Sequence, residues 1–90
     1  MFAVRETDDA KADVKELLLG IQLRIQALYQ RLTRWSNVSG YKAFRDSLHG
    51  AYRLRTGDYR ILFRVEHEVG RIVVFRIAHR RDVYDLWGAL

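Results

Sequence analysis

Arginine recurs at even spacings in two stretches of the second half of this 90-residue chain. One residue separates Arg53 from Arg55, and Arg60 and Arg64 lie four positions apart. Every second side chain of an extended strand points to the same face, so each pair is expected on one side of a sheet. A guanidinium group grips phosphate at two points and stacks on bases, which indicates a surface for nucleic acid. A face charged only for solubility is the alternative, and the spacing alone leaves both interpretations open.

Further polar side chains follow toward the C-terminal end. Arg76 joins the arginine face if its strand has the matching parity, and Arg80 and Arg81 come where that strand ends. Histidine side chains exchange protons near neutral pH, so His79 is a candidate general acid or base. A strand-end histidine bonded to the backbone is the other interpretation. Tyr84 is a lone aromatic residue, which is typical of packing unless it returns to the arginine face.

Several kinds of chemistry have no residues to support them. The sequence contains no cysteine, so a disulfide framework and a thiolate site are both excluded. His49, His67 and His79 are too scattered for the spacing of a metal site. No glycine-rich phosphate loop is present. We therefore expect a protein that works without a metal or a bound cofactor.

Composition and charge limit the class of protein. The length suits a single domain over residues 1–90, and 49% hydrophobic with 12% aromatic residues suffices for a core. The net charge of +5 predicts an acidic partner, either nucleic acid or protein. Acidic residues stand near the N-terminus where a signal peptide needs an apolar core, and no apolar run reaches the ~20 residues of a membrane span. These features predict a cytoplasmic protein without a membrane segment.

Apolar spacing in the first half predicts one strand and two helices. Alternation over residues 2–7 indicates a short strand. Thr7 and the two aspartates after it are favourable at a helix start, and apolar residues then recur at intervals of three and four. Gly20 is expected to end or kink this helix, and a second helix is expected over residues 21–35. The two would form a helical hairpin.

In the second half the period changes from helical to extended. Residues 41–50 favour an irregular stretch or a single turn of helix. Alternation and turn residues then predict strands over 51–55, 59–65 and 71–79, and the last, apolar on both faces, is expected to be central. Residues 82–87 would be a short helix or a docked coil. The fold class is therefore α+β, with a short N-terminal strand, a two-helix hairpin and a three-stranded antiparallel sheet with the helices packed on one face.

Two sequence motifs resemble a known family. These are residues 50–65, GAYRLRTGDYRILFRV, and residues 77–84, IAHRRDVY. They are similar to the central motifs of the RelE/ParE toxin superfamily. The stretch from the first motif to the second covers more than a third of the chain. The expected order of strand, helices and sheet is similar to the family fold over nearly the whole length. The resemblance implies a toxin of a type II toxin–antitoxin system.

The branches of the superfamily differ in their targets. RelE-like members enter the ribosomal A site and cleave messenger RNA without a metal, because the 2′-hydroxyl attacks the adjacent phosphate and leaves a 2′,3′-cyclic phosphate. The full arginine set favours this branch. The ParE branch, which inhibits DNA gyrase and is not a nuclease, is the alternative. An inactive relative that keeps only antitoxin binding is a further one.

The family pattern also implies roles for individual residues. Arg53 and Arg55 match two basic strand positions that are lysines in other members, and arginine does not release its proton. Proton transfer would then fall to His79. The spacing leaves open whether Arg80 or Arg81 is the basic residue of the last strand. The resemblance implies Arg55, Arg60, His79, Arg81 and Tyr84 as catalytic residues, and Arg53, Arg55, Arg64, Arg76 and Arg80 as RNA-binding residues.

The implied partners are the ribosome, its messenger RNA and a cognate antitoxin encoded beside the toxin. A domain of net charge +5 suits an acidic, partly disordered antitoxin segment that folds on binding. We expect that segment to lie along the helices and to cover or distort the basic face.

Overall fold

The computed structural model describes residues 1–43 and 50–83 of the chain. The expected C-terminal element at 82–87, Tyr84 included, lies largely outside the described residues, as does most of 41–50. The elements are β1 (Ala3–Glu6), α1 (Asp8–Lys15), α2 (Leu19–Leu32), β2 (Lys42–Ala43), β3 (Ala51–Thr56), β4 (Tyr59–Glu66), a 3-10 turn (His67–Val69) and β5 (Arg71–His79).

Helix α1 begins where expected and ends earlier than expected. The Thr7 side chain accepts a hydrogen bond from the Ala10 amide, as an N-cap residue does. The helix ends at Lys15 because the Gln22 side-chain amide donates to the Val14 and Leu17 carbonyls, at 3.0 and 2.9 Å. The prediction that Gly20 ends or kinks this helix is therefore wrong.

Helix α2 starts at Leu19, two residues before the predicted start, so Gly20 lies in its first turn. It stops at Leu32, three residues before the predicted end. There the Thr33 hydroxyl donates to the Gln30 carbonyl at 2.6 Å, a local bond that competes with continued helix. Within the described residues, neither helix has the length and hydrophobicity that a bilayer crossing requires.

The sheet has five strands, in the order β1-β5-β4-β3-β2, and not the three that were predicted. The three predicted strands form its centre, and β5 lies inside the sheet, as expected. The N-terminal strand β1 pairs in parallel with β5 and adds one edge. The other edge is β2, a two-residue strand antiparallel to β3 that is too short to show any alternation. The fold is α+β, as predicted.

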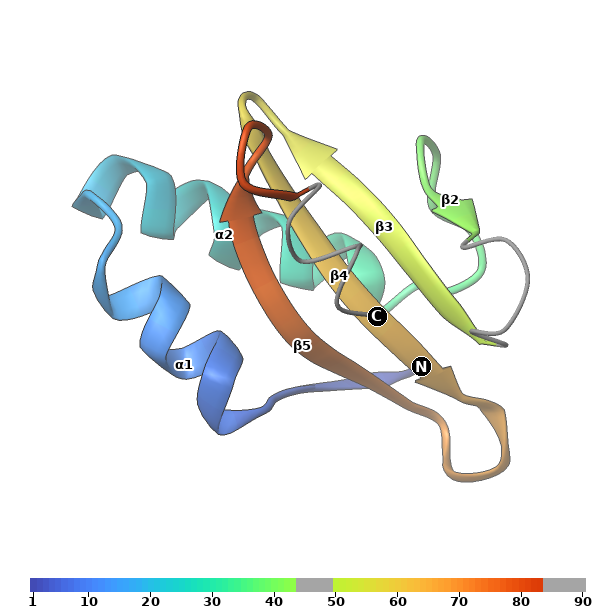
Figure 1. Cartoon of the computed structure of the whole chain (residues 1–90). Helices are drawn as coiled ribbons and strands as arrows, with labels where there is room; N and C mark the ends of the chain where they lie inside the picture. The colour runs from blue at the N-terminus through green and yellow to red at the C-terminus, as the bar shows by residue number, and fades with distance from the viewer. Residues whose placement is uncertain (44–49, 84–90) are drawn as a thin grey trace.

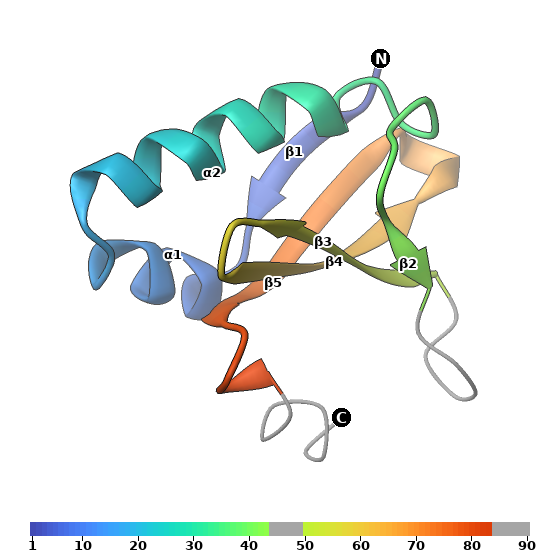
Figure 2. The same cartoon turned by 90° about the horizontal axis from the view of Figure 1, so that it is seen from above.

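The two helices lie together on one face of the sheet, as Figures 1 and 2 show. The core lies between these layers, where Ile25 and Leu32 of α2 meet Ile61 and Phe63 of β4, all at 0% exposure. The Tyr29 hydroxyl adds a polar link from α2 to β1, since it donates to a Glu6 carboxylate oxygen at 2.7 Å. We call the side away from the helices the open face.

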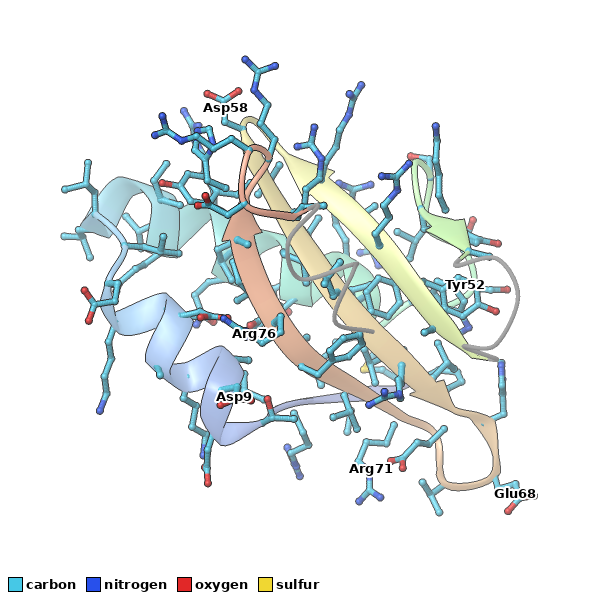
Figure 3. All side chains as sticks on the ribbon, viewed as in Figure 1. Asp9, Tyr52, Asp58, Glu68, Arg71 and Arg76 are labelled. Atoms are coloured by element: carbon cyan, nitrogen blue, oxygen red, sulfur yellow. The ribbon has the colours of Figure 1, made fainter. Side chains whose placement is uncertain are left out.

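A β-bulge interrupts β5. Leu62 pairs with Arg76 and Phe63 pairs with Val74, so Phe75 is the extra residue of β5. Beside the bulge, Asp13 of α1 accepts hydrogen bonds from Arg76 Nε at 2.9 Å, Arg76 Nη2 at 3.2 Å and the Ile77 amide at 2.8 Å. Figure 3 shows Arg76 between β5 and α1. Asp13 thus fastens α1 to the part of β5 that lies beyond the last β1 pair, at Val74.

Replacing Asp13 with alanine removes the acceptor of these bonds and leaves the half-buried Arg76 without its carboxylate. Charged hydrogen bonds contribute about 1.5–3 kcal/mol each, with strong coupling among them, so we expect the free energy of unfolding to fall by about 2–3 kcal/mol. Chemical denaturation measures the change. Glu16→Ala, at an exposed carboxylate just past the end of α1, is the control and should cost less than about 0.5 kcal/mol. Equal losses for both variants would contradict the role of Asp13.

Candidate nucleic-acid interface

Strand register gathers cationic side chains on the open face. Tyr52 and Leu54 pack toward the core, so Arg53 and Arg55, which alternate with them, point to the open face as predicted. Lys42 of β2 pairs with Arg53, and Arg55 pairs directly with Arg60 of β4. Like charges directly opposite each other destabilise a strand pair by a few tenths to about 1 kcal/mol. The fold therefore holds these charges together at a cost.

The first pocket on this face is lined by the side chains that the register brings together. It has a volume of about 290 Å³ and is lined by Gly40, Lys42, Arg53, Arg55 and Arg60. Four of these five residues carry a positive charge, and they come from three neighbouring strands or their ends. A pocket of this size and charge suits a phosphate group.

A second pocket adjoins the first at Arg53 and Arg60, which line both. It has a volume of about 480 Å³, and Arg80, Arg81 and Val83 complete its lining. These three residues follow β5, and Val83, at 3% exposure, is buried. The segment after β5 thereby adds two more guanidinium groups to the open face. The two pockets with their shared wall can receive two neighbouring phosphates of one strand.

Arg60 stands at the centre of this charge. Its guanidinium Nη1 donates to the Gly57 and Tyr59 carbonyls, at 3.1 and 3.2 Å, which orients the group at the start of β4. Burial lowers the pKa of Arg60, and repulsion from Arg55, Arg53 and Arg80 lowers it further. A bound anion would relieve that repulsion, so the site is prepared for negative charge.

Asp58 links the β3–β4 turn to the segment that follows β5. The Arg80 amide donates to the Asp58 carbonyl at 2.6 Å, and the Arg80 guanidinium lies 3.7 Å from the Asp58 carboxylate. The two side chains are about two-thirds exposed, so their ion pair contributes little and the backbone bond is the firmer link. Figure 3 shows Asp58 at the tip of the turn. This link places Arg80 and Arg81 beside Arg60.

His79 lies on the other side of the sheet from the arginine pockets. It pairs with Tyr59, and their rings meet edge to face with centroids 5.4 Å apart. Both residues share the parity of the core pair Ile61 and Ile77, whereas Arg60 pairs with Ala78 on the open face. His79 lines a pocket of about 460 Å³ toward α1, and Arg81 lines both this pocket and the second arginine pocket. The structure therefore does not bring His79 together with Arg60.

Arg64 and Arg76 also lie apart from the two pockets. Arg64 is on the open face, but its guanidinium carbon sits 4.5 Å over the Phe75 ring. Arg76 is bound to Asp13, where the side-chain hydrogen bond raises the pKa of its guanidinium. Tyr84 lies outside the described residues. Lys42 belongs to the cationic cluster although the sequence did not indicate it, because only the pairing of β2 with β3 places it there.

The repulsion between Arg55 and Arg60 leads to a prediction. Arg55→Gln should raise the free energy of unfolding by about 0.2–1 kcal/mol, because a like-charge pair is lost. The same change should make the plot of log binding constant for single-stranded RNA against log salt concentration less steep. The slope should fall in magnitude by about 0.7, the contribution of one phosphate contact. Denaturation and titration of a labelled oligoribonucleotide at several salt concentrations measure these effects. Arg5→Gln, at an exposed site on β1, should leave both unchanged. A destabilised Arg55→Gln with an unchanged salt slope would contradict this account of the site.

Comparison with known proteins places the chain in a family. The family model for the ParE toxin of the type II toxin–antitoxin system parDE matches residues 4–84. Toxin RelG of Mycobacterium tuberculosis is 32% identical over 84 residues, which cover 92% of this chain and 95% of RelG. In the crystal structure of the RelBE2 toxin–antitoxin complex from Mycobacterium tuberculosis, one chain is 28% identical with a TM-score of 0.76, and the match covers 88% of this chain and 98% of that one.

The fold itself is shared more widely than the sequence. The isolated RelE toxin of E. coli matches with a TM-score of 0.76 over 99% of this chain and 97% of its own, at 14% identity. This match shows the fold alone. The family model and RelG, in contrast, match in sequence over nearly the whole length. The chain thus belongs to the RelE/ParE superfamily and is a toxin of a type II toxin–antitoxin system.

Proposed function

We propose that this toxin is a ribosome-dependent endoribonuclease that cleaves messenger RNA and so stops translation. The observation that carries the proposal is the wall of Arg53 and Arg60 shared by two cationic pockets on the open face. The guanidinium group of arginine can donate two parallel hydrogen bonds to phosphate oxygens, and neighbouring cationic pockets suit the repeating phosphates of one RNA strand. An inhibitor that acts through protein contacts alone has no need of such a pair of pockets.

The chemistry follows from charge and position. The ribose 2′-hydroxyl attacks the adjacent phosphorus, the bond from phosphorus to the 5′-oxygen breaks, and a 2′,3′-cyclic phosphate remains. The transition state gathers more negative charge on the phosphoryl oxygens than the ground state carries. Guanidinium groups that the sheet already holds in place stabilise that charge without reorganisation, which is electrostatic catalysis. Arg60, held by two backbone carbonyls, is the residue with the strongest claim to this role.

The ribosome supplies what the pockets lack. The described residues that line them are charged or small and contact the backbone of RNA better than its bases. Selection of the cut site therefore falls to the ribosome, which presents the message in a fixed geometry, as in the RelE-like branch that the motifs resemble. The proposal places the toxin in the cytoplasm with its target.

A cognate antitoxin is the second proposed partner. RelBE2 of Mycobacterium tuberculosis was crystallised as a toxin–antitoxin complex. In this chain the start of α2 presents Leu18, Leu19 and Leu23 to solvent at 80, 69 and 61% exposure. Such an apolar patch marks an interaction site. We expect an acidic antitoxin segment to cover this patch along the helices and to mask the positive charge of the open face.

Primer extension on translated messages after induction tests the activity. Wild-type toxin should produce codon-phased cuts, and Arg60→Gln should reduce them by about 10²–10³-fold, the usual loss of one oxyanion-stabilising group. Arg71→Gln is the matched control, since Arg71 is exposed and paired with Glu66 far from the pockets (Figure 3). It should cut like wild type.

A supercoiling assay with purified DNA gyrase accompanies this test. The ParE branch, whose name the family model bears, is the alternative activity. Inhibited gyrase together with intact messages would replace the proposal with that alternative. Growth without arrest and without cuts would indicate an inactive relative.

A further inference from the structure

The proposed cleavage leaves a proton to be supplied. As the bond from phosphorus to the 5′-oxygen breaks, that oxygen would leave as an alkoxide, which is a poor leaving group. A proton delivered to the oxygen makes it a good one. Arginine cannot serve, because its guanidinium does not give up a proton in proteins. His79, the proton-transfer residue expected from the sequence, lies on the other side of the sheet. Among the described residues that line the two arginine pockets, Lys42 alone has a side chain that can exchange a proton.

Lys42 is placed where the reacting phosphate would bind. It pairs with Arg53, so the two side chains leave the sheet on the same face and side by side. It lines the pocket of about 290 Å³ together with Arg55 and Arg60. Its ammonium group ends a flexible four-carbon stem with three rotatable donors, which lets it follow a leaving group. Lys42 is exposed, so solvent can restore its proton after each turnover.

We propose that Lys42 is the general acid of the cleavage, an inference that rests on the proposed endoribonuclease function. The bond from the 2′-oxygen to phosphorus forms, and the bond from phosphorus to the 5′-oxygen breaks. The 2′-hydroxyl proton passes to water, and Lys42 Nζ gives its proton to the 5′-oxygen. The products are a 2′,3′-cyclic phosphate and a 5′-hydroxyl, and the neutral amine regains a proton from solvent. The adjacent arginines stabilise the phosphoryl charge throughout.

Exchange of Lys42 for arginine separates proton donation from charge. Lys42→Arg keeps the positive charge and removes the transferable proton, whereas Lys42→Gln removes both. In single-turnover cleavage on programmed ribosomes at saturating toxin, we expect Lys42→Arg to be about 100-fold slower than wild type. Its binding to single-stranded RNA should stay close to that of wild type, and Lys42→Gln should bind more weakly as well. Lys11→Arg, an exposed lysine of α1, is the control and should cleave normally.

A modified message makes the test specific. A sulfur in place of the 5′-oxygen at the cleaved linkage leaves as a thiolate and needs no proton. On that message Lys42→Arg should cleave as fast as wild type. Full activity of Lys42→Arg on the normal message, or a defect that persists on the sulfur-containing one, would overturn the assignment. A melting temperature of Lys42→Arg equal to that of the wild type excludes misfolding as the cause of slow cleavage.

The proposed function fails in a different way from the Lys42 assignment. If the wild-type toxin leaves both messages intact on the ribosome, the endoribonuclease proposal falls, and the general acid falls with it. If the wild-type toxin cleaves both messages and Lys42→Arg does so equally well, only the general acid is lost.

Discussion

The antiparallel register of β3 with β4 is the constraint from which the basic site follows. It sets Arg55 opposite Arg60 on the open face while Leu54 meets Ile61 beneath the helices. A slip of one residue would turn every side chain to the other face, so guanidinium groups would face the core and apolar residues would face water. Burial of the apolar set therefore also holds the arginines together against their mutual repulsion.

Alternation along a single strand was enough to predict which arginines share a face. It could not tell which residue of another strand lies alongside, because that depends on pairing. Lys42 is the example, since a strand of two residues has no period and β3 alone gives it a position. The α+β class and the order of the elements were predictable because they rest on patterns that extend over many residues.

The rest of the prediction was limited by single residues that interrupt the regular alternation of a strand or the regular length of a helix. The bulge at Phe75 adds one residue to β5, so the surroundings of Arg76 and His79 do not follow from parity along that strand. At the helices, the Gln22 side chain closes α1 before Gly20 is reached. A bond between a side chain and a distant backbone group has no signature in apolar spacing, and the same holds for Asp13, which fixes α1 against β5.

The wall of Arg53 and Arg60, shared by two pockets, has a consequence for how such a toxin can change over generations. Under the proposed function, a substitution at Arg55 or Arg81 would change one of these two pockets and leave the lining of the other intact, so RNA binding would weaken only in part. A substitution at Arg53 or Arg60 would change both pockets at once, and its effect would not simply add to that of a neighbouring substitution. Under the proposed function, loss of toxic activity by a single substitution is therefore expected most readily at these two positions.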